Sequence, residues 1–368
     1  MERRRFLQTA TAGALAGAGA VAAPWVHAQE PRLRWRMATS WPESLEPLFG
    51  GASHFCQRVG ELTGGRFEIR PYAGGELVGG LQVLDAVRSG TVETGHTASY
   101  YYTGTAQSLA FDTAVPFGMT ARMQNAWLYQ GGGRELMNER VFRPLGIVAF
   151  PAGNTGTQMG GWFREEVPDL AALQGLRMRI PGLGGEIMQR LGVSVQTLAA
   201  AEIYPALERG VIDATEFVGP WDDERLGFWE VAKNYYYPSW WEPGAMVSVY
   251  VNAERYDALP ERYRQAITAA AAETNVRITS DYDQRNPPAV RRLRENGVRF
   301  RRFSDDIMAA AEREAYALYE ELAEDDAQWR EIYGEWKAFR DLQYEWFGLA
   351  EQGYARFAYG RGEVMGDG

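Results

Sequence analysis

Two segments in the middle of the chain carry amide and guanidinium groups that could bind a small anion. Residues 153–163 are rich in glycine and place Asn154 and Gln158 around a turn. This segment has neither a Walker lysine nor a GxGxxG spacing, so it does not predict a phosphate cradle. Residues 176–185 run from a strand pattern into a Pro-Gly turn, with Arg179 near the end of the strand. Arginine there could hold a carboxylate through two parallel hydrogen bonds, although a surface salt bridge would have the same pattern.

Two further segments each set a glutamate beside aromatic rings, in chain interrupted by proline and glycine. Glu216 precedes Phe217, and Glu242 follows Trp240 and Trp241. Two carboxylates near aromatic rings are typical of a glycosidase, in which one acid–base pair works beside sugar-stacking rings. The composition of these segments therefore favours such an enzyme and a protein that only binds its ligand equally.

The overall composition narrows the classes of function. Hydrophobic residues make up 46% of the chain and charged residues 23%, which is an ordinary globular balance, and 368 residues predict two domains. The formal net charge of −10 argues against a nucleic-acid partner, because phosphate binding needs a basic face. A single cysteine, Cys56, and only three histidines exclude a disulfide framework and any metal site built from several cysteines or histidines.

The N-terminus has the three parts of an export signal. Arginines at positions 3–5 precede Phe-Leu, an Ala/Gly-rich run follows at residues 10–23, and Val26-His27-Ala28 offers small residues to a signal peptidase. The apolar run is too short to span roughly 30 Å of hydrocarbon. We therefore expect residues 1–28 to be a twin-arginine-type signal peptide and the mature protein to be periplasmic.

The residues around these segments predict an α/β fold. Patterns of strand, helix, strand, helix, strand occupy residues 33–38, 48–59, 66–70, 81–87 and 91–94. This order predicts a largely parallel sheet. A helix, a glycine stop and a strand with an acidic residue recur 120 positions later, so we expect a second lobe of similar architecture.

The apolar segments at residues 147–151 and 247–251 are predicted to cross between the lobes and form a hinge. We expect lobe I to comprise residues 29–150 with parts of 245–300, and lobe II to comprise residues 151–244.

Residues 260–360 are predicted to be long helices that span the lobes. An aromatic stripe with three- and four-residue steps runs from Trp329 to Leu349, and other rings, such as Tyr344, lie off it. One interpretation is a helix buried on two sides within one subunit. The other is a dimer contact, in which a C-terminal helix could be exchanged between subunits. The sequence leaves both open.

Taken in order, these motifs resemble the solute-binding proteins of tripartite ATP-independent periplasmic (TRAP) transporters, and among them the α-keto-acid-binding group of a DctP-like family. The resemblance extends from the export signal to the C-terminal helices. The matching motifs are Gly-Gly-Glu-Leu-Val at 74–78, Ser-Tyr-Tyr-Tyr at 99–102, Gly-Asn-Thr-Gly at 153–156 with Trp-Phe at 162–163, Met-Arg at 178–179, Ile-Tyr-Pro-Ala-Leu at 203–207, Asp-Ala-Thr-Glu at 213–216 and Trp-Trp-Glu at 240–242.

The resemblance implies a bilobed periplasmic-binding-protein fold that closes on its ligand without catalysis. It implies that Arg179 binds the substrate carboxylate beside a metal ion. The metal ligands would be the Gln158 side chain, the carboxylates of Glu216 and Glu242, and the main-chain oxygen of Phe217. The family usually has tryptophan where this chain has Phe217, so an indole N–H is missing from the pocket wall.

The resemblance also implies a pocket wall that includes Asn154, Tyr100 and Tyr101, and a homodimer formed through a C-terminal helix.

A charge count independently favours the metal. Glu216, Glu242 and a substrate carboxylate sum to −3 against +1 from Arg179. Two like charges about 4 Å apart repel by about 4 kcal/mol at an effective dielectric constant of about 20, so one arginine should not offset two such pairs. Because all the expected ligands are oxygens, we expect a hard cation, sodium first and calcium as the alternative.

The sequence therefore predicts a periplasmic receptor, not an enzyme. It would bind a small 2-oxo or 2-hydroxy monocarboxylate, such as pyruvate, together with a cation, and deliver it to TRAP membrane subunits. The alternatives are an exported glycosidase that uses the paired carboxylates, and a scaffold that takes no small ligand.

Overall fold

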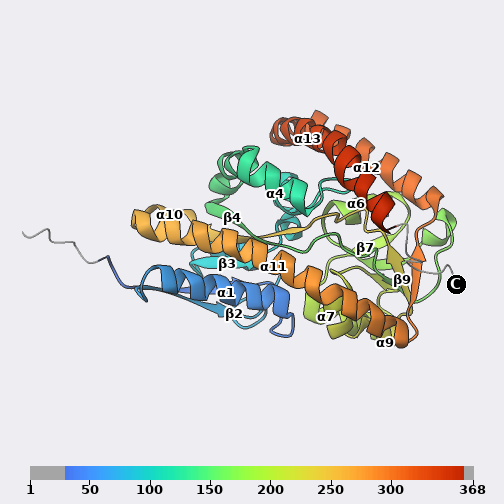
Figure 1. The fold of residues 1–368 in the computed structure, drawn as a ribbon, viewed down its shortest axis with the longest axis horizontal. Coiled ribbons are helices and arrows are strands. Elements are labelled where there is room, and N and C mark those ends of the chain that lie inside the picture. The colour runs from blue at the N-terminus through green and yellow to red at the C-terminus, as the bar shows by residue number, and fades with distance from the viewer. Residues whose placement is uncertain (1–29, 360–368) are drawn as a thin grey trace, which may run out of the picture. The chain divides into compact units, whose positions relative to one another are not determined.

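The structure, a computed structural model, describes residues 30–359 (Figure 1). The signal peptide expected at residues 1–28 lies outside the described residues. By their contacts, residues Leu33–Gly368 form one unit, separate from Met1–Arg32. Within the described residues, no helix has the length and apolarity that a membrane span requires.

The first lobe is built on a five-stranded sheet in the order β2-β1-β3-β10-β4. Its strands are β1 (Leu33–Thr39), β2 (Phe67–Tyr72), β3 (Thr94–Thr97), β4 (Ile147–Asn154) and β10 (Met246–Asn252). β1 pairs in parallel with β2 and β3, as predicted, but β10 runs antiparallel to both β3 and β4. The sheet is therefore mixed, because the chain leaves the lobe after β4 and returns in the opposite direction as β10.

The second lobe is built on a six-stranded sheet in the order β11-β9-β5-β8-β6-β7. Its strands are β5 (Trp162–Phe163), β6 (Arg177–Arg179), β7 (Ser194–Gln196), β8 (Ala214–Thr215), β9 (Asn234–Tyr237) and β11 (Arg299–Arg302). β5 pairs antiparallel with β8 and β9, while β6 pairs in parallel with β7 and β8.

The strand predicted at residues 91–94 is wrong by three positions, since β3 begins at Thr94. Glu93 accepts a hydrogen bond from the main-chain N–H of Arg36 (2.8 Å), so its side chain occupies the edge of β1 just before the ladder starts. The second lobe repeats this arrangement. Asp213 accepts from the main-chain N–H of Arg177 (3.1 Å), and β8 begins at the next residue.

Helices cover both sheets. Those of the first part of the chain are α1 (Glu46–Leu62), α2 (Val83–Arg88), α3 (Ala110–Thr113), α4 (Ala121–Gln130), α5 (Gly133–Met137), α6 (Gly182–Arg190), α7 (Ala200–Glu208), α8 (Pro220–Arg225) and α9 (Phe228–Val231). The remaining helices are α10 (Ala253–Asp257), α11 (Glu261–Glu295), α12 (Asp305–Asp325), α13 (Ala327–Phe347) and α14 (Gly353–Tyr359).

The longest helix, α11, links the lobes. It packs against α1 and β4 of the first lobe and against α8 of the second (Figure 1). Its 35 residues continue through Pro287 and Pro288, two residues that usually end a helix.

The aromatic stripe of α13 divides into a buried half and an exposed half. Trp329, Ile332 and Trp336 are buried in the chain's own core, where Trp329 lies 4.5 Å from the ring of Phe111. Farther along, Leu342, Trp346 and Leu349 are 65%, 60% and 81% exposed. The first half thus fits burial within one subunit, and the second half leaves an apolar face uncovered in the single chain.

Candidate functional site

Arg179 lies at the carboxyl end of β6. The parallel register with β8 sets Arg179 beside Thr215, the last residue of that strand. Because the carboxyl ends of parallel strands meet at one edge of a sheet, Glu216 emerges next to Arg179. The Arg179 side chain is fully buried and is therefore not a surface arginine. That description fits Arg177, two residues earlier, whose side chain is 48% exposed and pairs with Asp213.

The Arg179 guanidinium is held on one side and free on the other. Nη1 donates to the Glu216 carboxylate and, over 3.0 Å, to the Glu216 main-chain oxygen. Nε donates to the main-chain oxygen of Leu198 over 3.2 Å, and the Phe217 ring centre lies 5.6 Å from the guanidinium carbon. Nη2 is buried and has no hydrogen-bond partner among residues 30–359. This nitrogen is oriented by the other bonds and left open to a ligand.

Gln158 and Glu242 lie on two adjoining loops. The main-chain N–H of Gln158 donates to the main-chain oxygen of Glu242 (3.2 Å), and Gln158 Nε2 donates to Thr155 Oγ1 (3.1 Å). The Glu242 N–H donates to Ser239 Oγ (3.2 Å). These bonds fix the two loops, but Gln158 Oε1 and Glu242 Oε2 remain buried without a hydrogen-bond partner in the described chain.

Four of the sequence-predicted residues therefore share one property, a buried polar atom without a partner within residues 30–359. These atoms are Arg179 Nη2, Gln158 Oε1, Glu216 Oε2 and Glu242 Oε2. Each unsatisfied buried polar group costs about 1–3 kcal/mol, and native proteins contain few of them. One cation and one anionic ligand could satisfy all four atoms.

Burial raises the pKa values of the two carboxyl groups, and the charge of a nearby carboxylate adds to each shift, Asp223 for Glu216 and Glu216 for Glu242. Burial raises the pKa of Glu216, and the guanidinium of Arg179 opposes the shift. Burial also raises the pKa of Glu242 well above its usual range, and the charge of Glu216 raises it further. The two glutamates therefore lie close enough to repel each other, and one arginine does not fully compensate them.

The two predicted tyrosines come from the first lobe. They lie in η1 (Ser99–Tyr102), which follows β3, and their ring centres are 4.9 Å apart. Burial raises the pKa of Tyr100 well above its usual range, and the charge of Glu242 adds to this shift. Burial also raises the pKa of Tyr101, against the effect of Arg179. Both rings therefore lie within electrostatic reach of Arg179, Glu216 and Glu242.

Asn154, the remaining residue expected in the pocket wall, makes hydrogen bonds with both side-chain polar atoms. It is fully buried at the end of β4, but its Nδ2 donates to the main-chain oxygen of Gly244 (3.2 Å) and its Oδ1 accepts from the N–H of Gly156 (2.9 Å). Both side-chain atoms are therefore engaged in holding the two loops together.

Gly161 is a positioning residue that the sequence reasoning missed. Its φ is +86°, and a Cβ atom built on it would lie 2.5 Å from the main-chain oxygen of Thr215 and 3.2 Å from Cα of Glu216. Only glycine lets β5 approach Glu216 this closely. The Gly160-Gly161 pair in the sequence could have indicated a close approach of two backbones, but not that the neighbour is Glu216.

Two buried acids behind the site were also missed. Asp223 accepts hydrogen bonds from Trp162 Nε1 (2.9 Å) and Tyr235 OH (2.6 Å). Asp222 accepts from Tyr282 OH (2.6 Å) on α11, and burial raises its pKa to about 8. Nothing in the sequence separates these acids from surface ones.

The donor set fits a hard cation. Residues 30–359 contain no group of three or more His, Cys, Asp or Glu side chains that could hold a metal ion. A site in this cluster must therefore combine the two glutamates with an amide or main-chain oxygen, and the unpartnered Gln158 Oε1 supplies one. Carboxylate and amide oxygens are ligands for calcium and similar hard ions.

Comparison of the sequence with known families decides its membership. Residues 37–326 match the DctP family, the bacterial extracellular solute-binding proteins of family 7. The chain belongs to this family. One relative, the monocarboxylate 2-oxoacid-binding periplasmic protein of Nostoc sp., is 48% identical over 362 residues, which cover 97% of this chain and 99% of the relative. The predicted family resemblance and periplasmic location are thereby confirmed.

Two solved structures of TRAP solute-binding proteins have the same fold. The protein from Bordetella bronchiseptica, a dimer with calcium and picolinate in one active site, is 44% identical, with a TM-score of 0.88 over 90% of this chain and 98% of its own. The protein from Pseudoalteromonas atlantica, with bound sodium and pyruvate, is 37% identical, with a TM-score of 0.86 over 88% and 99%. The predicted bilobed α/β fold is confirmed.

Proposed function

We propose that this DctP-family protein is the periplasmic receptor of a TRAP transporter and binds a small 2-oxo or 2-hydroxy monocarboxylate, such as pyruvate, together with a metal ion. The observation that carries the proposal is the set of four buried atoms on Arg179, Gln158, Glu216 and Glu242 that lack a partner in the described chain. The name of the Nostoc relative and the sodium and pyruvate in the Pseudoalteromonas structure support the same ligand class.

In this proposal each residue has a separate role. Arg179 Nη2 donates to the ligand carboxylate, while the bonds of Nε and Nη1 keep the guanidinium plane fixed. Gln158 Oε1, the two glutamates and the main-chain oxygen of Phe217 hold the cation, which supplies the positive charge that Arg179 alone lacks. Sodium is the first expectation and calcium the alternative. Tyr100 and Tyr101 close the pocket from the first lobe.

We propose no catalysis. A receptor binds and releases its ligand unchanged, and contacts made by both lobes favour the closed conformation. The exported glycosidase has less support, because the matching family and the similar structures are solute-binding proteins.

A homodimer through the C-terminal helix is part of the proposal. Large apolar side chains are exposed on α13 and beyond it, and such surfaces mark interaction sites. They include Leu342, Trp346, Leu349, Tyr354 and Phe357. The delivery of ligand to TRAP membrane subunits and the division of the lobes at residues 150 and 244 stay predictions.

Calorimetric titration with pyruvate tests the function. The protein should bind pyruvate in buffer with sodium or calcium, and Arg179→Ala should abolish binding. The matched control is Arg177→Ala, which removes the same group two residues away on the same strand and should leave affinity unchanged. Equal affinity of the wild type and Arg179→Ala for pyruvate would exclude the assignment, and equal affinity in chelated, ion-exchanged buffer would exclude the metal.

A further inference from the structure

Asp223 is a buried acid of α8 that bonds to three separate parts of the second lobe. Its Oδ2 accepts hydrogen bonds from Trp162 Nε1 on β5 (2.9 Å) and from the hydroxyl of Tyr235 on β9 (2.6 Å). Its Oδ1 accepts from the main-chain N–H of Val218 (3.3 Å). The two rings are stacked with their centres 3.9 Å apart, so packing holds both donors in place. One carboxylate therefore ties β5 and β9 to the chain that follows β8.

The three bonds suit an ionised acid. An ionised carboxylate accepts at both oxygens, whereas an amide has one nitrogen that can only donate. The indole N–H of Trp162 faces one oxygen and the main-chain N–H of Val218 faces the other, so asparagine would set a donor against a donor. Burial raises the pKa of Asp223 to about 6, against the effect of its bonds, so the acid carries its charge at pH 7.

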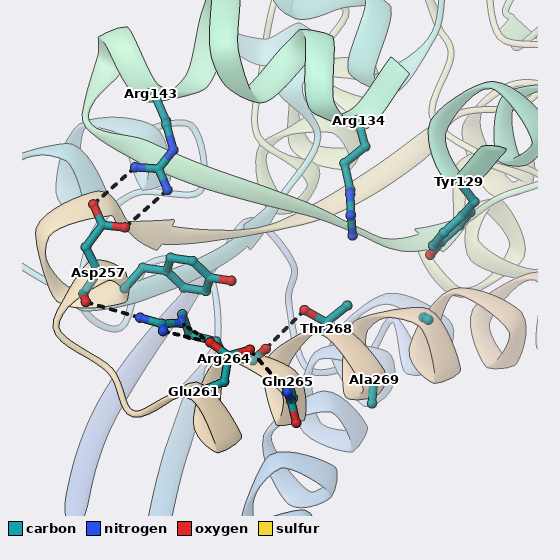
Figure 2. Close-up of a pocket in the computed structure, with 11 residues that line it drawn as sticks. Tyr129, Arg134, Arg143, Asp257, Glu261, Arg264, Gln265, Thr268 and Ala269 are labelled. Atoms are coloured by element: carbon teal, nitrogen blue, oxygen red, sulfur yellow. Dashed lines mark hydrogen bonds and ion pairs between the residues drawn. The ribbon is translucent and has the colours of Figure 1, made fainter. Parts of the chain in front are cut away.

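Asp223 differs in its partners from the acids of the first-lobe cavity that α5, α10 and the start of α11 line (Figure 2). There Arg143 makes two bonds of 3.1 Å to the two oxygens of Asp257. Arg264 bonds to Glu261 over 2.7 and 3.1 Å. Within residues 30–359, the hydrogen bonds of the Asp223 side chain come only from neutral donors. No ion pair cancels its charge, which therefore acts on its surroundings.

The bonds of Asp223 reach the main chain beside two expected cation ligands. Val218 directly follows Phe217, whose main-chain oxygen is one of these ligands. The main-chain oxygen of Val218 accepts from the N–H of Met159 (3.2 Å), which directly follows Gln158. Asp223 thus helps to hold both stretches of chain without bonding to the expected ligands themselves.

The charge of Asp223 also lies near a third expected ligand. Trp162 directly follows Gly161, at which a Cβ atom would lie 3.2 Å from Cα of Glu216. Burial raises the pKa of Glu216, Arg179 opposes the shift, and the charge of Asp223 raises it further. Asp223 is therefore within electrostatic reach of this carboxylate.

We propose that Asp223 is a positioning residue of the cation site and raises the affinity for the cation in two ways. Its bonds hold the main chain beside Phe217 and Gln158, and its buried charge attracts the ion. The inference rests on the proposed function, of which the cation is a part. Because the energy of an ion in a fixed field is proportional to its charge, the second effect is larger for calcium than for sodium.

The main test is Asp223→Asn, which removes the charge and nearly keeps the size of the side chain. Pyruvate is titrated by calorimetry into ion-exchanged protein at several concentrations of calcium or of sodium, which gives the half-saturating concentration of each ion. Half-saturating calcium should rise about tenfold, the smaller end of the loss seen when a partner behind a metal ligand is removed. Half-saturating sodium should rise only about threefold. A loss of position alone would change both by the same factor.

Asp222→Asn is the matched control. Asp222 is the adjacent residue and is also fully buried, but its side chain accepts from Tyr282 on α11. Within the described chain it makes no side-chain bond to the stretches that carry Gln158 and Glu216. Burial raises its pKa to about 8, so at pH 7 it is mostly protonated and its substitution removes little charge. Both half-saturating concentrations should stay at the wild-type values.

A second variant separates position from charge. Tyr235→Phe removes one bond to Asp223 and keeps the carboxylate, so it also serves if Asp223→Asn does not fold, which urea denaturation without ligand shows. It should raise the half-saturating concentrations of calcium and sodium by the same factor, about threefold, the size of one lost hydrogen bond. Calcium titrated without pyruvate gives a readout that is independent of the organic ligand, and Asp223→Asn should bind it about tenfold more weakly.

Two results would overturn the inference. An unchanged ratio of the calcium to the sodium value in Asp223→Asn would remove the role of the charge, and wild-type values for both ions in Tyr235→Phe would remove the role of position. Failure of the wild type to bind pyruvate with either ion would instead refute the proposed function. The calcium titration without pyruvate would then decide alone, and equal or absent calcium binding in the wild type and Asp223→Asn would refute the role of Asp223.

Discussion

Two arginine–carboxylate pairs link β6 with the chain around β8, and one is partly exposed to solvent while the other is fully buried. Arg177 and Asp213 form an ion pair whose side chains are 48% and 30% exposed. Arg179 and Glu216 repeat the pairing two and three residues farther along, with both side chains fully buried. The first pair is joined by two side-chain hydrogen bonds at the protein surface, while the second leaves Nη2 and Oε2 buried without partners in the described chain. The residue types are equivalent, and burial with incomplete bonding marks the site.

Substitutions that break one pair or the other should differ most in their effect on the free energy of unfolding. Arg179→Gln leaves Glu216 and Glu242 buried together without a counter-charge, which should lower the free energy of unfolding by about 3 kcal/mol. Arg177→Gln, its solvent-exposed counterpart, should leave the urea midpoint nearly unchanged because solvent screens that pair. Urea denaturation of both variants without ligand measures the difference. Equal midpoints would remove the distinction between the two pairs.

The next effect concerns how closely β5 approaches Glu216. Gly161→Ala should cost about 2 kcal/mol of unfolding free energy, because the positive φ and the close main-chain oxygen both oppose a Cβ atom. Gly175 also has a positive φ, +75°, but a Cβ atom placed on it would have no neighbouring atom within 4 Å. Gly175→Ala should therefore cost only the conformational part, about 1 kcal/mol. Thermal unfolding compares the two, and the same loss in both would show that the contact is irrelevant.

An added negative charge beside Glu216 and Glu242 should raise the preference of the site for calcium over sodium. Gln158→Glu places a third carboxylate beside Glu216 and Glu242, so a divalent ion becomes better matched than a monovalent one. We expect the ratio of pyruvate affinity in calcium to that in sodium to rise about tenfold, about 1.4 kcal/mol. An unchanged ratio in calorimetry would place Gln158 outside the cation's ligand shell.

A buried acid without a hydrogen-bonded arginine gives an effect that depends on pH. Burial raises the pKa of Asp222 to about 8, above its ordinary value of 3.8. Between these values the folded protein keeps a proton that the unfolded chain releases, so this group makes stability fall as pH rises from about 4 to about 8. The slope should be about 1 kcal/mol per pH unit near its steepest. Asp222→Asn should flatten it in urea titrations at several pH values, and an unchanged slope would contradict the shift.

The sequence predicted those parts of the site that depend on strand order. Arg179 ends a predicted strand and Glu216 follows another, so parallel pairing alone brings them together. The sheet of the first lobe was predicted less well, because the direction in which β10 returns depends on the path of the chain through the second lobe. The periodicity of the sequence could not place the start of β3 either. The Glu93 carboxylate accepts the hydrogen bond of the Arg36 main-chain N–H, so the main-chain pairing of β3 with β1 begins only after Glu93.

Other features were beyond the sequence for physical reasons. Whether Asp222 and Asp223 are buried depends on Tyr282 and Tyr235, which are distant in the chain. The proline pair at 287–288 would normally end a helix, yet α11 continues, so its length reflects packing on both lobes more than local propensity.

The long helix α11 has a mechanical consequence for a receptor that opens and closes. With 35 residues it extends about 52 Å, and it is attached to the first sheet at one end and to α8 at the other. The lobes are therefore joined by a long helix as well as by the chain crossings after β4 and before β10, and this helix limits their rotation against each other. Pro287 and Pro288 remove two amide donors near the second-lobe end of α11, which makes that stretch the natural place for the helix to bend.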